Sequence, residues 1–143
     1  LRYSTLRQLI FGIFDLTLHT TKKQIDPAKL YRNMMKKYTG IVVPKEAIFP
    51  AGFGHLDGYD AGYYGYLWSK VYAADMFTRF EKEGILSKKV GADYKKWILE
   101  KGGSMEDIDL VKGFLGRKPS NEAFLIEIGA KSPSKTRVQT QLW

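Results

Sequence analysis

Glycine and proline interrupt the chain repeatedly between Gly40 and Gly58, and this interruption limits what the sequence can fold into. Val43 precedes Pro44, so it is disfavoured in the middle of a helix, and another proline and two more glycines follow before Gly58. The side chains between these breaks are bulky and mostly apolar: Phe49, Phe53, His55 and Leu56. Long connections in compact domains are usually functional or disordered, and bulky side chains argue against disorder. The sequence therefore predicts a long ordered loop over residues 40–58.

Apolar residues on both sides of this loop recur with helical spacing. A first helix is predicted over residues 3–19. Asp26 followed by Pro27 is typical of a helix start and Gly40 of a helix end, so a second helix is predicted between them. The longest helix is predicted after the loop, from about Asp60 to Glu83.

Three further helices are each predicted to begin at a serine that can cap them: Ser87, Ser104 and Ser120. The first would end before Gly102 and the last at Gly129, and the second has a variant of the capping box, with Asp107 three residues after its serine. Residues 131–143 are polar, basic and aperiodic, which predicts a disordered tail. The sequence thus predicts an all-α fold of about six helices over residues 1–130.

The composition excludes several classes of protein. The chain has 143 residues, 44% of them hydrophobic, which is enough for the core of one domain. It has no cysteine, which excludes disulfides, thiolate nucleophiles and cysteine-based metal sites. No apolar run approaches the ~20 residues that a bilayer span needs, so no membrane partner is expected. The net charge of +8 suggests nucleic-acid binding. The lysines are scattered and form no basic stripe, however, so no nucleic-acid partner is predicted.

Three tyrosines follow the loop at spacings of four and three residues, namely Tyr59, Tyr63 and Tyr66. If the helix begins near Tyr59, the three phenols share one helix face, and the glycine-rich loop brings His55 to it. Such a cluster can offer several hydroxyl donors and an imidazole to one polar ligand. Tyrosines at helical spacing also form cores and interfaces, so periodicity alone leaves both roles open. The neighbouring aromatic residues are interpreted as packing residues: Tyr64, Trp68 and Tyr72.

Residues 53–68 read FGHLDGYDAGYYGYLW, which resembles the C-terminal signature of the thimet oligopeptidase and neurolysin family, oligopeptidase family M3. The likeness extends to residues 9–15 before the loop and to residues 71–77 and 114–119 after it. It covers residues 6–129 in all. One departure is a spacing between the histidine and the first tyrosine that is one glycine shorter than the usual thimet pattern and similar to that of mitochondrial intermediate peptidase.

This resemblance implies that the chain is the C-terminal, substrate-binding part of a zinc-dependent metalloendopeptidase that cleaves short peptides. In the family a zinc-bound water attacks the peptide carbonyl, which creates an oxyanion. By resemblance, Tyr66 is the donor that stabilises this oxyanion, and His55 forms a hydrogen bond near the cleavage point. A phenol suits this task because its ordinary pKa of ~10 keeps its proton in place at pH 7.

The resemblance also implies a substrate-binding role for four residues beside the catalytic pair. Tyr59 and Tyr63 would hold the backbone of the peptide. Gly54 and Gly58 would let the loop hinge over it. Short peptides and the upstream part of the same enzyme are therefore the expected partners.

Zinc is expected in the full-length enzyme and not in this chain. The family's H-E-x-x-H motif and the glutamate ligand after it are absent, and in the family both precede the position of Leu1. The chain has two histidines, whereas a catalytic zinc site needs three protein ligands. His19 is interpreted as a polar residue at a helix C-terminus. Asp15 and Asp75 lie in helices without a partner base and are interpreted as structural. The chain alone is therefore predicted to be inactive.

One alternative stays open from the sequence: the chain could be a non-catalytic helical module for binding or self-association. A basic nucleic-acid-binding domain is a third class, but it would need a clustered basic stripe, which the sequence lacks. The start, Leu1-Arg2-Tyr3, has no initiator methionine, so we expect the chain to be part of a longer protein. A lobe removed from a larger enzyme exposes apolar surface, which predicts a homodimer or higher oligomer of the fragment. A cytoplasmic location is predicted, with the mitochondrion as the alternative.

Overall fold

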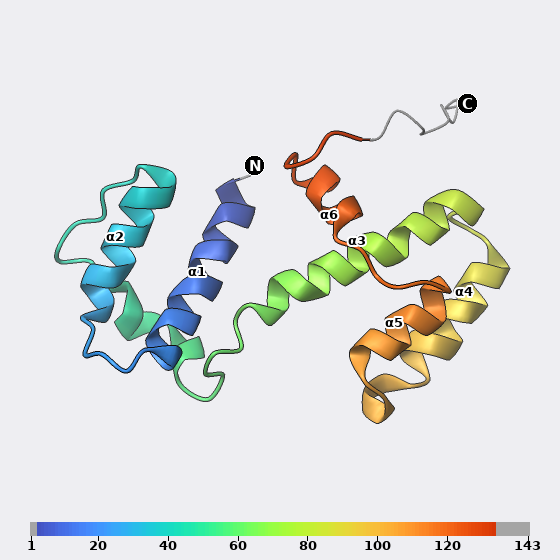
Figure 1. The fold of residues 1–143 in the computed structure, drawn as a ribbon, viewed down its shortest axis with the longest axis horizontal. Coiled ribbons are helices and arrows are strands. Elements are labelled where there is room, and N and C mark those ends of the chain that lie inside the picture. Colours follow the sequence, from blue (N-terminus) through green and yellow to red (C-terminus); the bar gives the residue numbers. More distant parts are fainter. Residues whose placement is uncertain (1–2, 134–143) are drawn as a thin grey trace. The chain divides into compact units, whose positions relative to one another are not determined.

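The structure is a computed structural model that describes residues 3–133, and it confirms the predicted all-α class. These residues form six α-helices joined by short 3₁₀ and π turns, and no strand occurs among them (Figure 1). The chain divides into two compact units, residues 1–69 and residues 70–143. The prediction of a disordered tail falls largely on residues 134–143, outside the described part of the chain.

Two helices build the first unit, α1 (Tyr3–Thr20) and α2 (Pro27–Thr39), and they pack side by side. The predicted ends of α2 are confirmed. The Asp26 carboxylate accepts a hydrogen bond of 3.0 Å from the backbone N–H of Lys29, and Gly40 ends the helix in the left-handed region at φ 75°. The helices are held by apolar side chains that become buried between them: Ile10, Phe14, Tyr31, Met34 and Met35.

The loop after Gly40 is ordered, as predicted, because its aromatic side chains complete the core of the first unit. It contains two 3₁₀ turns, η1 (Phe49–Gly52) and η2 (Gly54–Leu56). The ring centroid of Phe49 lies 4.2 Å from that of Tyr31 on α2 and 5.0 Å from that of Phe11 on α1. Stacked contacts of this kind are favourable in addition to the area they bury. The loop is therefore anchored to both helices immediately before it reaches His55.

The third helix, α3 (Gly65–Glu83), begins five residues later than predicted. Residues 59–64 form turns, and Ala61 has φ 55°, which lies outside the right-handed helical region. Periodicity suggested an earlier start because the tyrosine spacing of four and three matches a helix. The backbone instead turns here, and the N–H groups of Ala61 and Tyr63 donate to the carboxylate of Asp15 on α1.

In the second unit, α4 (Lys88–Tyr94) begins at the predicted cap: the Ser87 hydroxyl accepts from the N–H of Val90 at 3.4 Å. The helix continues as a π turn, η3 (Lys95–Leu99), and a 3₁₀ turn, η4 (Gly102–Ser104), follows. The predicted helix over residues 87–101 is therefore present with a change of winding after its second turn.

The last two helices are shorter than predicted at their N-termini. The fifth, α5 (Asp107–Leu115), has Glu106 in the cap position, so the prediction that Ser104 caps it was wrong. Ser104 instead ends η4. The sixth, α6 (Glu122–Glu127), follows Asn121, and Ser120 precedes it by two residues. The Ser120 hydroxyl still accepts a hydrogen bond of 3.1 Å from the N–H of Glu122.

A buried carboxylate ties α3 to the segment between α5 and α6. Asp75, 2% exposed, accepts hydrogen bonds of 2.6 and 2.8 Å from the guanidinium of Arg117 and of 2.7 Å from the N–H of Ser120. The structural interpretation of Asp75 therefore agrees with its surroundings, although it has a cationic partner that the sequence did not indicate. Nearby, the core of this unit is formed by buried apolar residues: Val90, Leu110, Val111 and Phe114.

Several large apolar side chains are exposed in the described residues. Leu86 is 94% exposed, Val42 74% and Phe77 51%. Self-association of the chain stays a prediction. Within residues 3–133, none of the helices has the length and apolar character that crossing a bilayer requires.

Candidate functional site

A groove of about 630 Å³ lies on the first unit, and its walls come from α1, the loop and the start of α3. Three of the predicted site residues with polar side chains line it: His55, Tyr59 and Tyr66. The predicted glycines Gly54 and Gly58 line it as well, together with Arg7 and Phe11 of α1. Sequence reasoning did not single out Arg7. Its guanidinium lies 4.8 Å from the centre of the Phe11 ring and so places a cation at the groove.

His55 and Tyr66 form the polar centre of this groove. The Nε2 atom of His55 lies 3.2 Å from the phenolic oxygen of Tyr66, within hydrogen-bond distance. The ring of Tyr59 lies beside both, with centroids 6.0 Å from His55 and 5.9 Å from Tyr66. Tyr59 and Tyr66 are 46% and 47% exposed, so both phenols can reach a ligand.

Tyr63 differs from the other two tyrosines because its ring is part of the core. It is 7% exposed, and its hydroxyl donates to the side-chain oxygen of Gln8 at 2.8 Å. Burial raises the pKa of the Tyr63 phenol above its ordinary value of 10.0. The ring centroid lies 4.9 Å from that of His55 and 5.1 Å from that of Tyr66. The buried Tyr63 ring therefore packs against the rings of both His55 and Tyr66 from the core side.

The three tyrosines converge on His55 although Tyr59 and Tyr63 precede α3, so the premise of a shared helix face was wrong. A turn brings the tyrosines together instead. Gly58, at φ 85°, allows the backbone to enter this turn. The Tyr59 ring lies so close to Gly62 that a Cβ at position 62 would be 2.9 Å from a ring carbon. Glycine at position 62 thus allows the ring to lie over the turn.

Tyr64 and Trp68 face solvent more than the packing interpretation implied. Tyr64 is 47% exposed and Trp68 51%. Tyr64 does not line the groove, which agrees with the prediction that its phenol points away from the other three.

Asp15 holds this turn, which sequence reasoning missed. Its side chain is fully buried on α1, and its two oxygens accept the N–H groups of Ala61 at 3.2 Å and Tyr63 at 3.0 Å. The interpretation that Asp15 has no partner base was wrong, since Nδ1 of His19 lies 2.9 Å from its Oδ1. His19 lies in the last turn of α1, as predicted. The only sequence signal for this contact was an acidic residue at a position whose neighbours at i−4 and i−1 are apolar, Phe11 and Phe14.

The described residues do not fit a catalytic zinc site. No group of three or more His, Asp or Glu side chains among residues 3–133 is placed to hold a metal ion. His55 has a tyrosine as its polar neighbour, and the groove contains one carboxylate, that of Asp57. Such a groove can donate hydrogen bonds to a polar ligand, but it supplies too few ligands for a metal.

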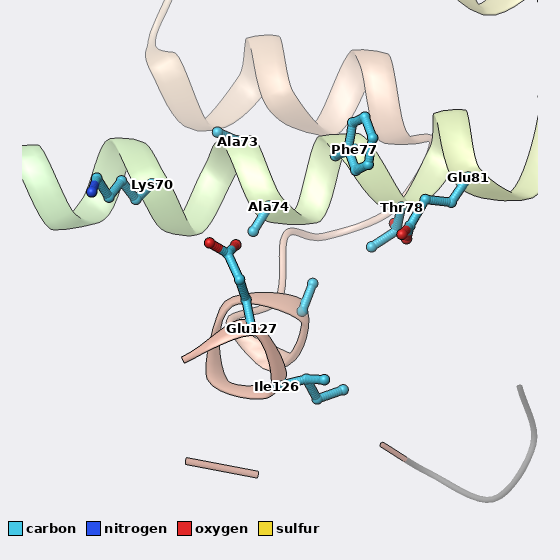
Figure 2. A pocket seen from close by; sticks show the side chains of 9 residues that line it. Lys70, Ala73, Ala74, Phe77, Thr78, Glu81, Ile126 and Glu127 are labelled. Carbon is cyan, nitrogen blue, oxygen red and sulfur yellow. The ribbon is translucent and has the colours of Figure 1, made fainter. Parts of the chain in front are cut away.

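A second cavity, of about 610 Å³, lies in the second unit between α3 and α6 (Figure 2). Its α3 wall includes Ala73, Ala74 and Phe77, and its α6 wall includes Ile126 and Glu127. Its lining combines these apolar residues with four polar ones, Lys70, Thr78, Glu81 and Glu127, and none of the predicted site residues lines it. The groove around His55 is therefore the candidate site.

Comparison with known proteins gives one consistent result. The sequence matches the family described as "Peptidase family M3" over residues 2–130. Oligopeptidase A of Escherichia coli is 44% identical over 131 residues, covering 88% of this chain and 19% of that protein. Saccharolysin of Saccharomyces cerevisiae is 39% identical over 136 residues, covering 90% and 19%. A protein of Arabidopsis thaliana named "Organellar oligopeptidase A, chloroplastic/mitochondrial" is 34% identical over 139 residues, covering 91% and 18%. The chain thus spans about a fifth of the length of these relatives.

Proposed function

Because this chain belongs to peptidase family M3, we propose that it is the substrate-binding part of a zinc-dependent oligopeptidase that cleaves short peptides. The relatives named oligopeptidase support peptides as the substrate class. The groove on residues 1–69 supports a binding role, since it presents phenol and imidazole groups at an open surface. The metal and the residues that hold it would come from other parts of the protein.

The observation that carries this proposal is the contact between His55 Nε2 and the Tyr66 hydroxyl at 3.2 Å. We propose that Tyr66 donates its proton in a hydrogen bond to the oxyanion that forms when the peptide carbonyl is attacked. His55 orients this hydroxyl in the free site and forms a hydrogen bond to the peptide when it is bound. Tyr59 borders the peptide backbone through its exposed phenol, Tyr63 supports the site from the core through its ring contact with His55, and Gly54 and Gly58 give the loop its hinge.

The test uses a complete peptidase that contains this segment. The natural longer protein serves if its gene encodes one, and a chimera in which residues 1–130 replace the matching segment of E. coli oligopeptidase A serves otherwise. Tyr66→Phe removes the donor and keeps the ring, so kcat should fall about 100-fold while KM changes little. Tyr64→Phe is the matched control, because Tyr64 has similar exposure and does not line the groove. Equal losses from the two changes would refute the assigned role of Tyr66.

The isolated chain should hydrolyse no peptide and bind zinc weakly or not at all. The reason is that the described residues contain no cluster of metal ligands. Fluorogenic peptides and a calorimetric zinc titration check both parts of this prediction. Chelator-sensitive turnover by the purified chain would contradict it.

The alternative is a non-catalytic helical module that binds a partner or itself, and the exposed side chains of Leu86 and Phe77 are the observation in its favour. Under this alternative the complete protein lacks peptidase activity, and the Tyr66 change has no kinetic effect. We place the protein in the cytoplasm, with the mitochondrion as the alternative; the Arabidopsis relative is named as chloroplastic/mitochondrial.

A further inference from the structure

A fully buried carboxylate requires compensation, and Asp15 obtains it from the turn that carries the site tyrosines. Burying an ionised group without partners is very unfavourable. Asp15 has 0% exposure, and its two oxygens accept backbone N–H groups 46 and 48 residues further along the chain, those of Ala61 and Tyr63. These two hydrogen bonds form only when residues 61–63 lie against α1 in this conformation.

His19 supplies a third donor. Its Nδ1 lies 2.9 Å from Asp15 Oδ1 and 2.9 Å from the Asp15 main-chain oxygen, and because both are acceptors the hydrogen must be on Nδ1. The other ring nitrogen lies 3.9 Å from the carboxylate of Asp60, at the beginning of the same turn. The end of α1 therefore contacts the turn at several neighbouring residues.

The backbone of this turn is one that would not persist without such contacts. Ala61 has φ 55°, the left-handed region that is unfavourable for residues with a Cβ, and strained residues persist where their surroundings hold them. The carboxylate binds the N–H of this strained residue and the N–H two positions later. Tyr59 lies two residues before Ala61 and Tyr66 three residues after Tyr63, so the conformation of the turn sets how both rings face His55.

We propose that Asp15 is a positioning residue of the peptide-binding groove: its carboxylate fixes the turn at residues 59–64 and so sets the Tyr59, Tyr66 and His55 geometry. The catalytic consequence rests on the function proposed above, but the anchoring itself does not. Asp15 touches no ligand-facing atom and does not line the groove. It acts through the backbone of Ala61 and Tyr63.

The perturbation is Asp15→Asn, which keeps the shape of the side chain. An amide offers one carbonyl oxygen and one NH₂ group, so it can accept only one of the two N–H groups and places a donor against the other. Asp75→Asn is the matched control, because it is the same change at another buried carboxylate that accepts a backbone N–H, in the second unit. If Asp15→Asn alone does not fold, adding Ala61→Gly relieves the strain at φ 55° and keeps the test possible.

The first experiment measures amide hydrogen exchange by NMR on the complete 143-residue chain. In the Asp15→Asn variant the amides of Ala61 and Tyr63 should exchange at least about tenfold faster than in the wild type. The amides of the α1 core residues Ile10 and Phe14 should change much less, and contacts between the His55 and Tyr66 rings should weaken. Asp75→Asn should leave all of these unchanged. An equal acceleration in the turn and the α1 core, or none in the turn, would overturn the anchoring role.

The second experiment compares kinetics in the complete peptidase, with each variant at equal folded concentration. Asp15→Asn should lower kcat about tenfold or more, and Asp75→Asn should leave kcat unchanged. A partial recovery of kcat in the Asp15→Asn, Ala61→Gly double variant would further support positioning through the turn. A wild-type protein without peptidase activity would refute the proposed function, and the exchange data would still decide the anchoring. Normal kcat in Asp15→Asn beside a loosened turn would overturn the positioning proposal.

Discussion

Removal of the Arg117 guanidinium should lower the free energy of unfolding of the second unit. The burial of the Arg117–Asp75 ion pair sets limits on this loss. Arg117→Met keeps most of the apolar stem and deletes two charge-assisted hydrogen bonds to Asp75, of 2.6 and 2.8 Å. The Asp75 side chain that stays behind is 3% exposed. Its remaining donor in the described structure is the N–H of Ser120 at 2.7 Å.

Two limits define the expected cost. Breaking a fully buried ion pair by removing one partner costs about 3–5 kcal/mol, since a buried charge is left without compensation. An exposed ion pair contributes only about 0.2–1 kcal/mol. The Arg117 side chain is 46% exposed, whereas that of Asp75 is 3% exposed, so water can replace the guanidinium only in part. We therefore expect a loss of about 2 kcal/mol.

The assay is urea denaturation of the complete chain, followed by far-ultraviolet circular dichroism at pH 7. The Asp75→Asn, Arg117→Met double variant provides the internal control, because it removes the buried charge together with its partner. The double variant should be more stable than Arg117→Met alone. A loss below about 0.5 kcal/mol in Arg117→Met, or a double variant less stable than the single one, would refute the reasoning.

Two further predictions concern packing and pH. Gly113→Ala should cost about 1–3 kcal/mol in urea denaturation, because its Cβ would lie 2.3 Å from a ring carbon of Trp97, whereas Gly91→Ala, with open space around it, should be neutral or slightly stabilising. Burial raises the pKa of the Tyr63 and Tyr31 phenols above 10.0. The unfolded chain therefore releases these protons at lower pH than the folded chain does, and the free energy of unfolding should fall as the pH rises from 10 upward. Urea midpoints measured between pH 8 and 11 check this, and Tyr63→Phe should flatten the decline; an undiminished decline in that variant would contradict the assignment to Tyr63.

Helix ends were predictable where a local chemical group determines them. Asp26 and Gly40 bound α2 as expected, because a carboxylate cap and a left-handed glycine act on residues within one turn. Ser87 caps α4 for the same reason. The prediction that Ser104 caps α5 was wrong, because a serine in the sequence does not show whether its backbone can adopt the cap conformation. Ser104 instead lies in η4, the 3₁₀ turn that precedes α5.

The start of α3 was not predictable from local signals, because a distant residue determines it. Tyrosines at spacings of four and three favour a helix from residue 59, yet Asp15 binds the N–H groups of Ala61 and Tyr63 and holds the turn. The contact spans 46 residues of sequence, and periodicity contains no information about it. The structure nevertheless brings the rings of Tyr59, Tyr63 and Tyr66 beside His55, as the resemblance to the family signature suggested, while their roles stay predictions.

The groove and the contacts that support it lie in one compact unit of the chain. Each residue that lines the groove lies between Arg7 and Tyr66, within the first compact unit. The Asp15 contacts and the aromatic core formed by Phe11, Phe49 and Phe53 lie within the same unit. The signature segment therefore depends on α1 and α2 for its shape, and a peptide of the signature alone would lack the groove. The buried ion pair at Asp75 lies outside this unit, so its loss should lower stability while the His55–Tyr66 contact persists in molecules that remain folded.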